Sequence, residues 1–204
     1  MPGTLRATLQ RWVLPAAIAS TAIAFELGGE PARLLFRYQR DAVLEGEAWR
    51  LFTGNLVHLG PRHMALNLAG LALIMMLAAR LLQGLRGTLV ALGSMVAVGL
   101  GLLWFAPNVA WYVGSSGLLH GLLTWIVLQA MLTPGQRVWG GSLLVLLVIK
   151  LGWEQGVGPL PLTATLAGGP VVVAAHLFGA FGGAATGLAL RLVDSRRSAA
   201  PRRV

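Results

Sequence analysis

Two serines stand between glycines in the segment GSSGLLHG, residues 114–121, and an apolar run continues from it. A serine hydroxyl is a weak nucleophile until a base removes its proton, and histidine is the usual base. The chain contains four histidines, of which His176 lies early in another apolar run. Ser116 and His176 therefore predict acyl-transfer chemistry through a two-residue dyad. We expect the hydroxyl of the adjacent Ser115 to cap the start of the helix instead.

Acyl transfer also needs hydrogen-bond donors for the oxyanion of its tetrahedral intermediate. Asn67 follows His63 by four residues, so the two side chains share one helical face. Together with the backbone N–H of Ser116 at a helix start, they would supply these donors. We expect no carboxylate beside the dyad, because Glu154 and Asp194 flank the apolar runs. The orientation of the base must then come from packing or from hydrogen bonds.

The composition is that of a membrane protein. Of the 204 residues, 56% are hydrophobic and 11% are charged, whereas soluble domains carry roughly 25% charged residues. The 16 Lys and Arg against 7 Asp and Glu lie between apolar runs and at the ends, as topology determinants do, so we expect no nucleic-acid partner. The absence of cysteine excludes a disulfide framework, a thiol nucleophile and a thiolate metal site. We expect no metal and no cofactor.

Six apolar runs approach the roughly 17–25 residues that a membrane span needs. They are Trp12–Leu27, His58–Leu82, Thr88–Phe105, Ser116–Leu132, Trp139–Trp153 and Val171–Val193. Ala22 to Ala24 in the first run resembles a signal-peptide cleavage site. We favour an uncleaved helix, because a bundle of five spans would leave one without a partner. The predicted fold class is an all-α polytopic membrane protein, one domain over residues 1–204 with six transmembrane helices.

Arginines predict the orientation of these spans. They are Arg6, Arg11, Arg80, Arg86 and Arg137, with the basic tail 194–204. The positive-inside rule makes their side cytoplasmic. The opposite side receives segments 28–57, 106–115 and 154–170, although the first of these also carries arginines, which weakens the signal. Six spans leave both termini in the cytoplasm.

This topology brings polar residues from different helices to one depth. The second, fourth and sixth runs all begin at the outer face. At about 1.5 Å per residue, Ser116, His63 and His176 lie within roughly 10 Å of that boundary. Polar side chains there are costly in lipid unless they face one another or a water-filled cavity. Each has an ordinary structural explanation alone, and their convergence favours a site.

Glycines predict how the base reaches the serine. Gly117 and Gly121 lie four residues apart, and Gly179 and Gly183 follow His176 by three and seven residues. Small residues at this spacing let two helix backbones approach closely. We therefore expect the fourth and sixth spans to pack against each other along these glycines.

The ordered set of these residues resembles the rhomboid intramembrane serine proteases. The resemblance rests on Trp49-Arg50, on HLGPRHMALN from His58 to Asn67, on GSSG from Gly114 to Gly117, and on AHLFGAFGG from Ala175 to Gly183. It implies a six-helix rhomboid bundle with a catalytic core of about 49–193. It implies further that Ser116 is the nucleophile and His176 the base. His63, Asn67 and the Ser116 amide would then serve the oxyanion.

One residue departs from the family pattern. Rhomboids commonly carry a tyrosine four residues after the serine, packed against the basic histidine, and here that position is His120. With the segment RYQRDAVLEGEAWRLFTGNLVHL, residues 37–59, this resembles the rhombosortase subfamily. Three roles for His120 stay open: it stacks on the base, shares the proton, or does neither. His58, Gly114 and Gly117 are further candidates for packing or tuning.

The subfamily resemblance implies a substrate class. Its proposed substrates are exported bacterial proteins anchored by a C-terminal Gly-Gly-type sorting tail (GlyGly-CTERM), with small residues, one apolar span and a basic end. It implies a location in the bacterial inner membrane, with the site opening to the periplasmic side. The identity of the clients, the oligomeric state, and transfer of the acyl group to water or to another amine all stay open.

Two other function classes compete with the protease. A catalytically inactive rhomboid-like protein would bind membrane clients, and the presence of both Ser116 and His176 argues against it. A small transporter would want carboxylates within the spans. The segment 154–170, rich in Gly and Pro, is either a mobile cap over the site or a plain connection.

Overall fold

The computed structural model describes the backbone of residues 2–199 and the side chains of residues 10–197. Residues 200–204, the end of the predicted basic tail 194–204, lie outside the described residues. The side chain of Arg6, which contributed to the predicted orientation, also lies outside them.

The described chain is built almost wholly from α-helices. The long helices are α1 (Pro2–Leu27), α5 (Pro61–Ala78), α6 (Gly84–Phe105), α7 (Ser116–Leu132), α8 (Arg137–Gly156) and α10 (Val173–Ala199), and a 3-10 turn (Ala79–Leu82) follows α5. Each predicted apolar run corresponds to one of them. Among the described residues, three helices are long and apolar enough to cross a membrane, namely Pro61–Leu82, Gly84–Phe105 and Val173–Arg197, and α7 is a shorter apolar helix. The protein is thus an all-α polytopic membrane bundle, and six spans stay a prediction.

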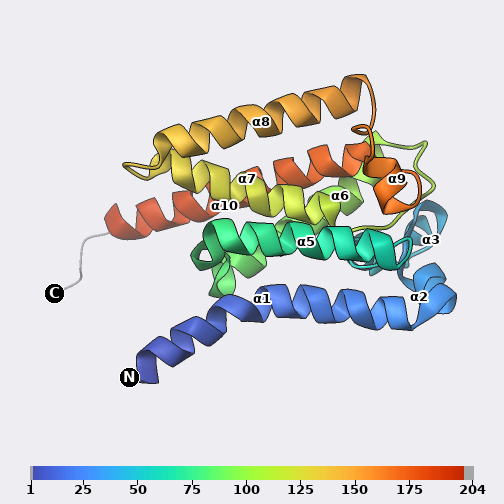
Figure 1. The fold of residues 1–204 in the computed structure, drawn as a ribbon, viewed down its shortest axis with the longest axis horizontal. Helices are drawn as coiled ribbons and strands as arrows, with labels where there is room; N and C mark the ends of the chain where they lie inside the picture. The colour runs from blue at the N-terminus through green and yellow to red at the C-terminus, as the bar shows by residue number, and fades with distance from the viewer. Residues whose placement is uncertain (1, 200–204) are drawn as a thin grey trace.

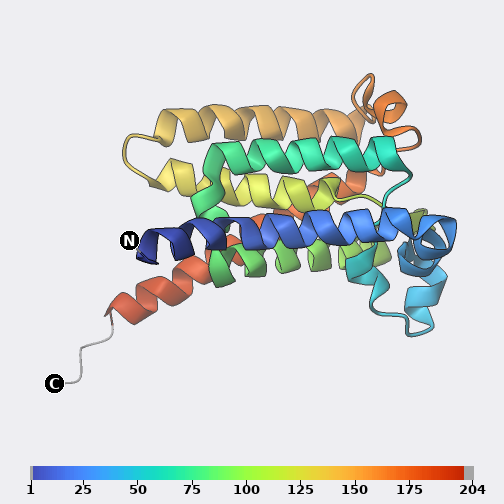
Figure 2. The ribbon, with the colours of Figure 1, turned by 60° about the horizontal axis from the view of Figure 1, so that its bottom comes forward.

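The long helices run side by side along one axis of the molecule (Figures 1 and 2). The first turns of α1 and the last turns of α10 lie at one end (Figure 1). The other end carries the short helices α2 (Gly29–Phe36), α3 (Arg40–Leu44) and α9 (Thr163–Ala167). α7 is central, because it packs against α5, α6, α8 and α10. Its buried residues lie on all sides, as expected of a helix surrounded by other helices.

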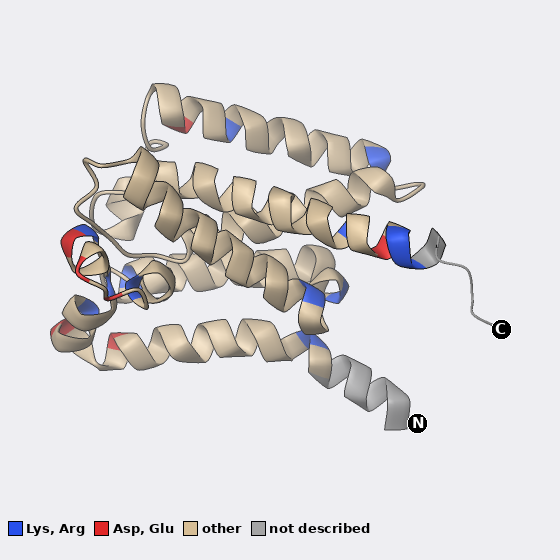
Figure 3. Cartoon of the chain, turned by 180° about the vertical axis from the view of Figure 1, so that it is seen from behind, with Lys and Arg blue, Asp and Glu red and all other residues tan. Residues whose placement is uncertain are grey.

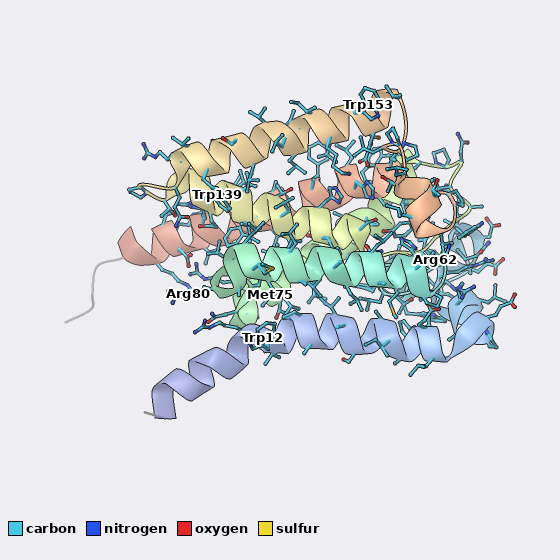
Figure 4. All side chains as sticks on the ribbon, viewed as in Figure 1. Trp12, Arg62, Met75, Arg80, Trp139 and Trp153 are labelled. Carbon is cyan, nitrogen blue, oxygen red and sulfur yellow. The ribbon has the colours of Figure 1, made fainter. Side chains whose placement is uncertain are left out.

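Charged and aromatic side chains mark the two ends of the bundle. Lys, Arg, Asp and Glu gather at the ends, and a largely uncharged band lies between them (Figure 3). The exposed Trp12 and Trp139 lie near Arg80 at one end, and the exposed Trp153 lies at the other (Figure 4). Tryptophan is enriched at membrane interfaces. The uncharged band is therefore the part of the bundle that faces lipid.

The segment before α5 forms a folded layer at the end that carries α9. It contains α2 (Gly29–Phe36), β1 (Tyr38–Gln39), α3 (Arg40–Leu44) and α4 (Arg50–Thr53), and β1 pairs antiparallel with β2 (Trp111–Tyr112). Buried Arg50 donates hydrogen bonds to the Leu34 and Arg37 carbonyls at 2.9 and 3.0 Å, and also bonds Glu47. Satisfying buried carbonyls in this way holds the layer together, so the Trp-Arg motif has a structural role.

α7 and α10 pack backbone against backbone, as the glycine spacing predicted. A Cβ added to Gly179 would lie 1.9 Å from the Gly117 carbonyl oxygen, and one added to Gly183 would lie 2.1 Å from that of Gly121. No side chain fits at such separations. The predicted close approach is confirmed, and it fixes the start of α10 beside the start of α7.

Candidate active site

The structure brings Ser116 and His176 into hydrogen-bond contact. Ser116 is the first residue of α7, and His176 lies in the first turn of α10. Ser116 Oγ and His176 Nε2 are 2.8 Å apart. The histidine is 2% exposed and the serine is half-buried. A nucleophile in direct contact with a buried base is the arrangement that acyl transfer requires.

The neighbouring serine points to a different histidine. Ser115 Oγ lies 3.3 Å from Nε2 of His58, and both residues are buried. We expected the Ser115 hydroxyl to cap the start of α7, and this prediction is wrong, because Ser115 makes no side-chain cap bond. Its backbone is helical, with φ −78° and ψ −2°, whereas a capping side chain normally needs the extended conformation.

His63 and Asn67 lie on one face of α5 and line the cavity that contains Ser116. The backbone N–H of Leu59 donates to His63 Nδ1 at 3.3 Å, so the neutral ring carries its proton on Nε2. The Asn67 amide donates one hydrogen bond to the His63 carbonyl at 3.0 Å and has a second N–H. The Ser116 N–H has no partner within its helix, since Ser116 is the first helical residue.

The turn before Ser116 depends on glycine. Gly114 has φ +128°, and a Cβ there would lie 2.7 Å from His63 Cε1, so a side chain would strain the backbone and displace the ring. The Tyr112 hydroxyl donates to the Gly114 carbonyl. Burial raises the pKa of Tyr112, which keeps this donor protonated. Gly114 and Gly117 thus act through packing: a Cβ at Gly117 would meet the Ala175 carbonyl at 2.7 Å.

A carboxylate accompanies the dyad, contrary to our expectation. Glu154 Oε2 lies 2.8 Å from His176 Nδ1, and Glu154 is 1% exposed. The sequence placed Glu154 just beyond a span that ended at Trp153, but α8 continues to Gly156 and directs Glu154 inward. The signal that could have identified Glu154 is Lys150, one helical turn earlier. Two charged residues at the end of an apolar run are costly in lipid unless they pair or face the bundle interior.

His120 stacks on the base. The His120 and His176 rings lie 4.3 Å apart between centroids, at an interplanar angle of 14°. His120 Nδ1 donates to the Ser116 carbonyl at 2.7 Å. Of the three roles left open, this geometry agrees with stacking on the base. His120 Nδ1 is occupied by its hydrogen bond to the Ser116 carbonyl.

We expect His120→Tyr to retain measurable activity, because a tyrosine ring can pack on His176 in the same place. The lost hydrogen bond to the Ser116 carbonyl is worth about 1 kcal/mol, which corresponds to less than a tenfold change in rate. Client cleavage by membranes carrying the variant measures this. His176→Ala is the reference for complete loss, and activity as low as that reference would assign His120 a role in the proton transfer.

A cavity of about 460 Å³ opens beside Ser116. Its walls come from α5, α7, α8, α10 and α9 (Thr163–Ala167), and its lining is mostly apolar, with Leu73 and Ile74 from α5 and Leu143 from α8. The segment 154–170 therefore contributes directly to the cavity, since Thr163 and Ala167 line it. α9 lies beside the ends of α5 and α8 (Figure 2).

One cluster of possible metal ligands occurs among the described residues, consisting of His120, Glu154 and His176. Its geometry does not suit a metal ion. A ligating nitrogen directs its lone pair within the plane of its ring, and the two histidine planes are nearly parallel and stacked. Lys150 Nζ, at 2.7 Å, already bonds Glu154 Oε1.

Comparison with protein families identifies the class. The chain matches the Rhomboid domain over residues 45–192, which is more than half of its length and contains all the site residues described above. The chain belongs to the rhomboid family, a family of intramembrane serine proteases. No curated protein matches the chain.

Proposed function

We propose that this protein is an intramembrane serine endopeptidase in which Ser116 is the nucleophile and His176 the base. The observation that carries the proposal is the 2.8 Å contact between Ser116 Oγ and His176 Nε2. Membership of the rhomboid family supports the reaction class. The site lies near the end of the bundle that carries α9, at the depth where a span begins.

In the proposed reaction His176 Nε2 takes the Ser116 proton as Oγ attacks the scissile carbonyl carbon. The His63 Nε2–H, the second N–H of Asn67 and the Ser116 N–H supply donors for the oxyanion. Such donors typically contribute about 3 kcal/mol each to the transition state. His176 then returns its proton to the leaving amine.

The cavity and the subfamily resemblance support a proposed substrate class. Apolar walls from α5 and α8 suit an apolar segment of a membrane-anchored protein. We propose that this segment is the C-terminal Gly-Gly-type sorting tail of an exported protein, cut near the outer face of the bacterial inner membrane. Both termini of the protease would then be cytoplasmic. Cleavage of a helical tail requires local unwinding, and glycine lowers helix stability by about 1 kcal/mol relative to alanine.

Replacing the Gly-Gly pair of such a tail by Leu-Leu should block processing, because leucine stabilises the helix and opposes the local unwinding that cleavage requires. The measurement is release of the client from membranes that carry the protease, read on immunoblots. A client with Gly-Gly replaced by Ala-Ala is the control and should be cut more slowly than the natural tail but still detectably. Equal processing of the Leu-Leu client would contradict the substrate class. A protease that cuts neither client and fails to react with a fluorophosphonate would favour an inactive client-binding protein.

A further inference from the structure

We propose that Glu154 is a positioning residue that converts the Ser116–His176 pair into a Ser–His–Glu triad, and that Lys150 holds Glu154 in place. This inference rests on the proposed function. It adds to that function a carboxylate on α8, a helix that carries neither the nucleophile nor the base.

The contacts of His176 define its tautomer. Glu154 Oε2 is an acceptor 2.8 Å from Nδ1, so Nδ1 carries the ring proton. Nε2, 2.8 Å from Ser116 Oγ, then has a free lone pair directed at the hydroxyl. A histidine held in this tautomer by a second partner is oriented as a general base.

The two oxygens of Glu154 have separate partners. Oε1 accepts from Lys150 Nζ at 2.7 Å, and Oε2 faces His176. The Glu154 side chain is fully buried, and that of Lys150 is 32% exposed and reaches the cavity. A buried carboxylate is costly without a partner, and Lys150 provides one. The resulting order of contacts is Lys150, Glu154, His176, Ser116.

The triad accounts for every proton in the acylation step. The Ser116 proton moves to His176 Nε2 while Oγ bonds to the carbonyl carbon. His176 is then an imidazolium, and the Nδ1 proton stays on the ring, bonded to Glu154. The carboxylate thus stabilises positive charge that exists only after attack begins. As the C–N bond breaks, the Nε2 proton leaves with the amine, so His176 is neutral again. Ser116 Oγ then carries the acyl group until water or another amine displaces it.

The first test is Glu154→Gln, which keeps the size of the side chain and removes its charge. The Lys150 ammonium has donors only, so it selects the oxygen of the new amide. The amide NH₂ group then faces His176. Nδ1 becomes an acceptor, the ring proton moves to Nε2, and His176 loses its capacity to accept the serine proton. We expect kcat to fall by about 10²-fold or more, toward the roughly 10⁴-fold loss found when a serine triad carries the wrong tautomer. KM should change little, because Glu154 does not line the cavity.

The second test separates this role from a merely structural one. In Glu154→Gln combined with Lys150→Met, no ammonium holds the amide oxygen, so that oxygen can accept from Nδ1–H. We expect kcat of the double variant to exceed that of Glu154→Gln, with Lys150→Met alone as the reference. The matched acid-to-amide control is Glu45→Gln, at the exposed residue that follows α3. A double variant no more active than Glu154→Gln would overturn the assignment of Lys150.

A measurement on the unmodified protein keeps the inference testable if Glu154→Gln does not accumulate. In protein labelled with ¹⁵N-histidine, the His176 signal, assigned by its loss in His176→Gln, should report a proton on Nδ1. A proton on Nε2 would overturn the triad. So would near-normal kcat in Glu154→Gln while wild-type protein cleaves the client. Absence of wild-type cleavage and of fluorophosphonate labelling would instead contradict the proposed function.

Discussion

Ser116→Ala is expected to abolish both client cleavage and fluorophosphonate labelling, while the protein still accumulates in the membrane. Removal of Oγ removes the only atom within hydrogen-bond distance of His176 Nε2 among the described contacts. The side chain is half-buried at the start of α7, so the change leaves the packing between α7 and α10 intact. Gel fluorescence after labelling, together with client immunoblots, measures both effects.

Ser115→Ala is the matched control, because the two serines are adjacent and alike. Ser115 contacts His58, whereas Ser116 contacts the base. Its loss removes one buried hydrogen bond, about 1 kcal/mol of stability, and should preserve labelling and cleavage. Labelling that survives in Ser116→Ala and disappears in Ser115→Ala would show that Ser115 is the nucleophile.

Gly179→Ala is expected to prevent correct packing of α10 and to remove activity with it. The new methyl carbon would lie 1.9 Å from the Gly117 carbonyl oxygen, and neither backbone has room to retreat without moving His176 away from Ser116. Overpacking of a core commonly costs about 1–3 kcal/mol and sometimes more, and a backbone clash of this kind belongs at the upper end. Thermal unfolding in detergent and client cleavage should both show the loss.

Gly152→Ala on α8 provides the comparison. A Cβ there would meet no described atom within 4 Å, and glycine costs a helix about 1 kcal/mol relative to alanine. This variant should be at least as stable as the wild type and fully active. Equal behaviour of the two variants would mean that the close contact between α7 and α10 does not hold the site.

The glycine face was predictable because it depends on spacing within each helix, and the dyad because the topology brings the starts of two spans to one depth. Gly117 and Gly121 show their role in the sequence by their separation, and so do Gly179 and Gly183. His63 and Asn67 share a face for the same reason. A periodic pattern along an apolar run is enough to say which residues face the same neighbour.

Contacts that depend on where a helix ends, or on a partner elsewhere in the sequence, were not predictable. Ending the fifth span at Trp153 placed Glu154 outside the bundle, although one further helical residue brings it to His176. Ser115 was treated as a cap because nothing local indicates His58 as its partner. The layer of α2, α3 and α4 was also missed, since the hydrogen bonds of Arg50 go to backbone carbonyls that carry no side-chain signal.

The pairing of Lys150 with Glu154 also bears on how α8 enters the bilayer during synthesis. α8 is not among the described helices that are long and apolar enough to span by themselves. An isolated charge on an inserting helix is costly, but a lysine and a glutamate one turn apart can enter as a neutral pair. The short connection at residues 133–136 joins α8 to the apolar α7. The ion pair and the packing of α8 against the apolar α7 both lower the cost of holding α8 in lipid.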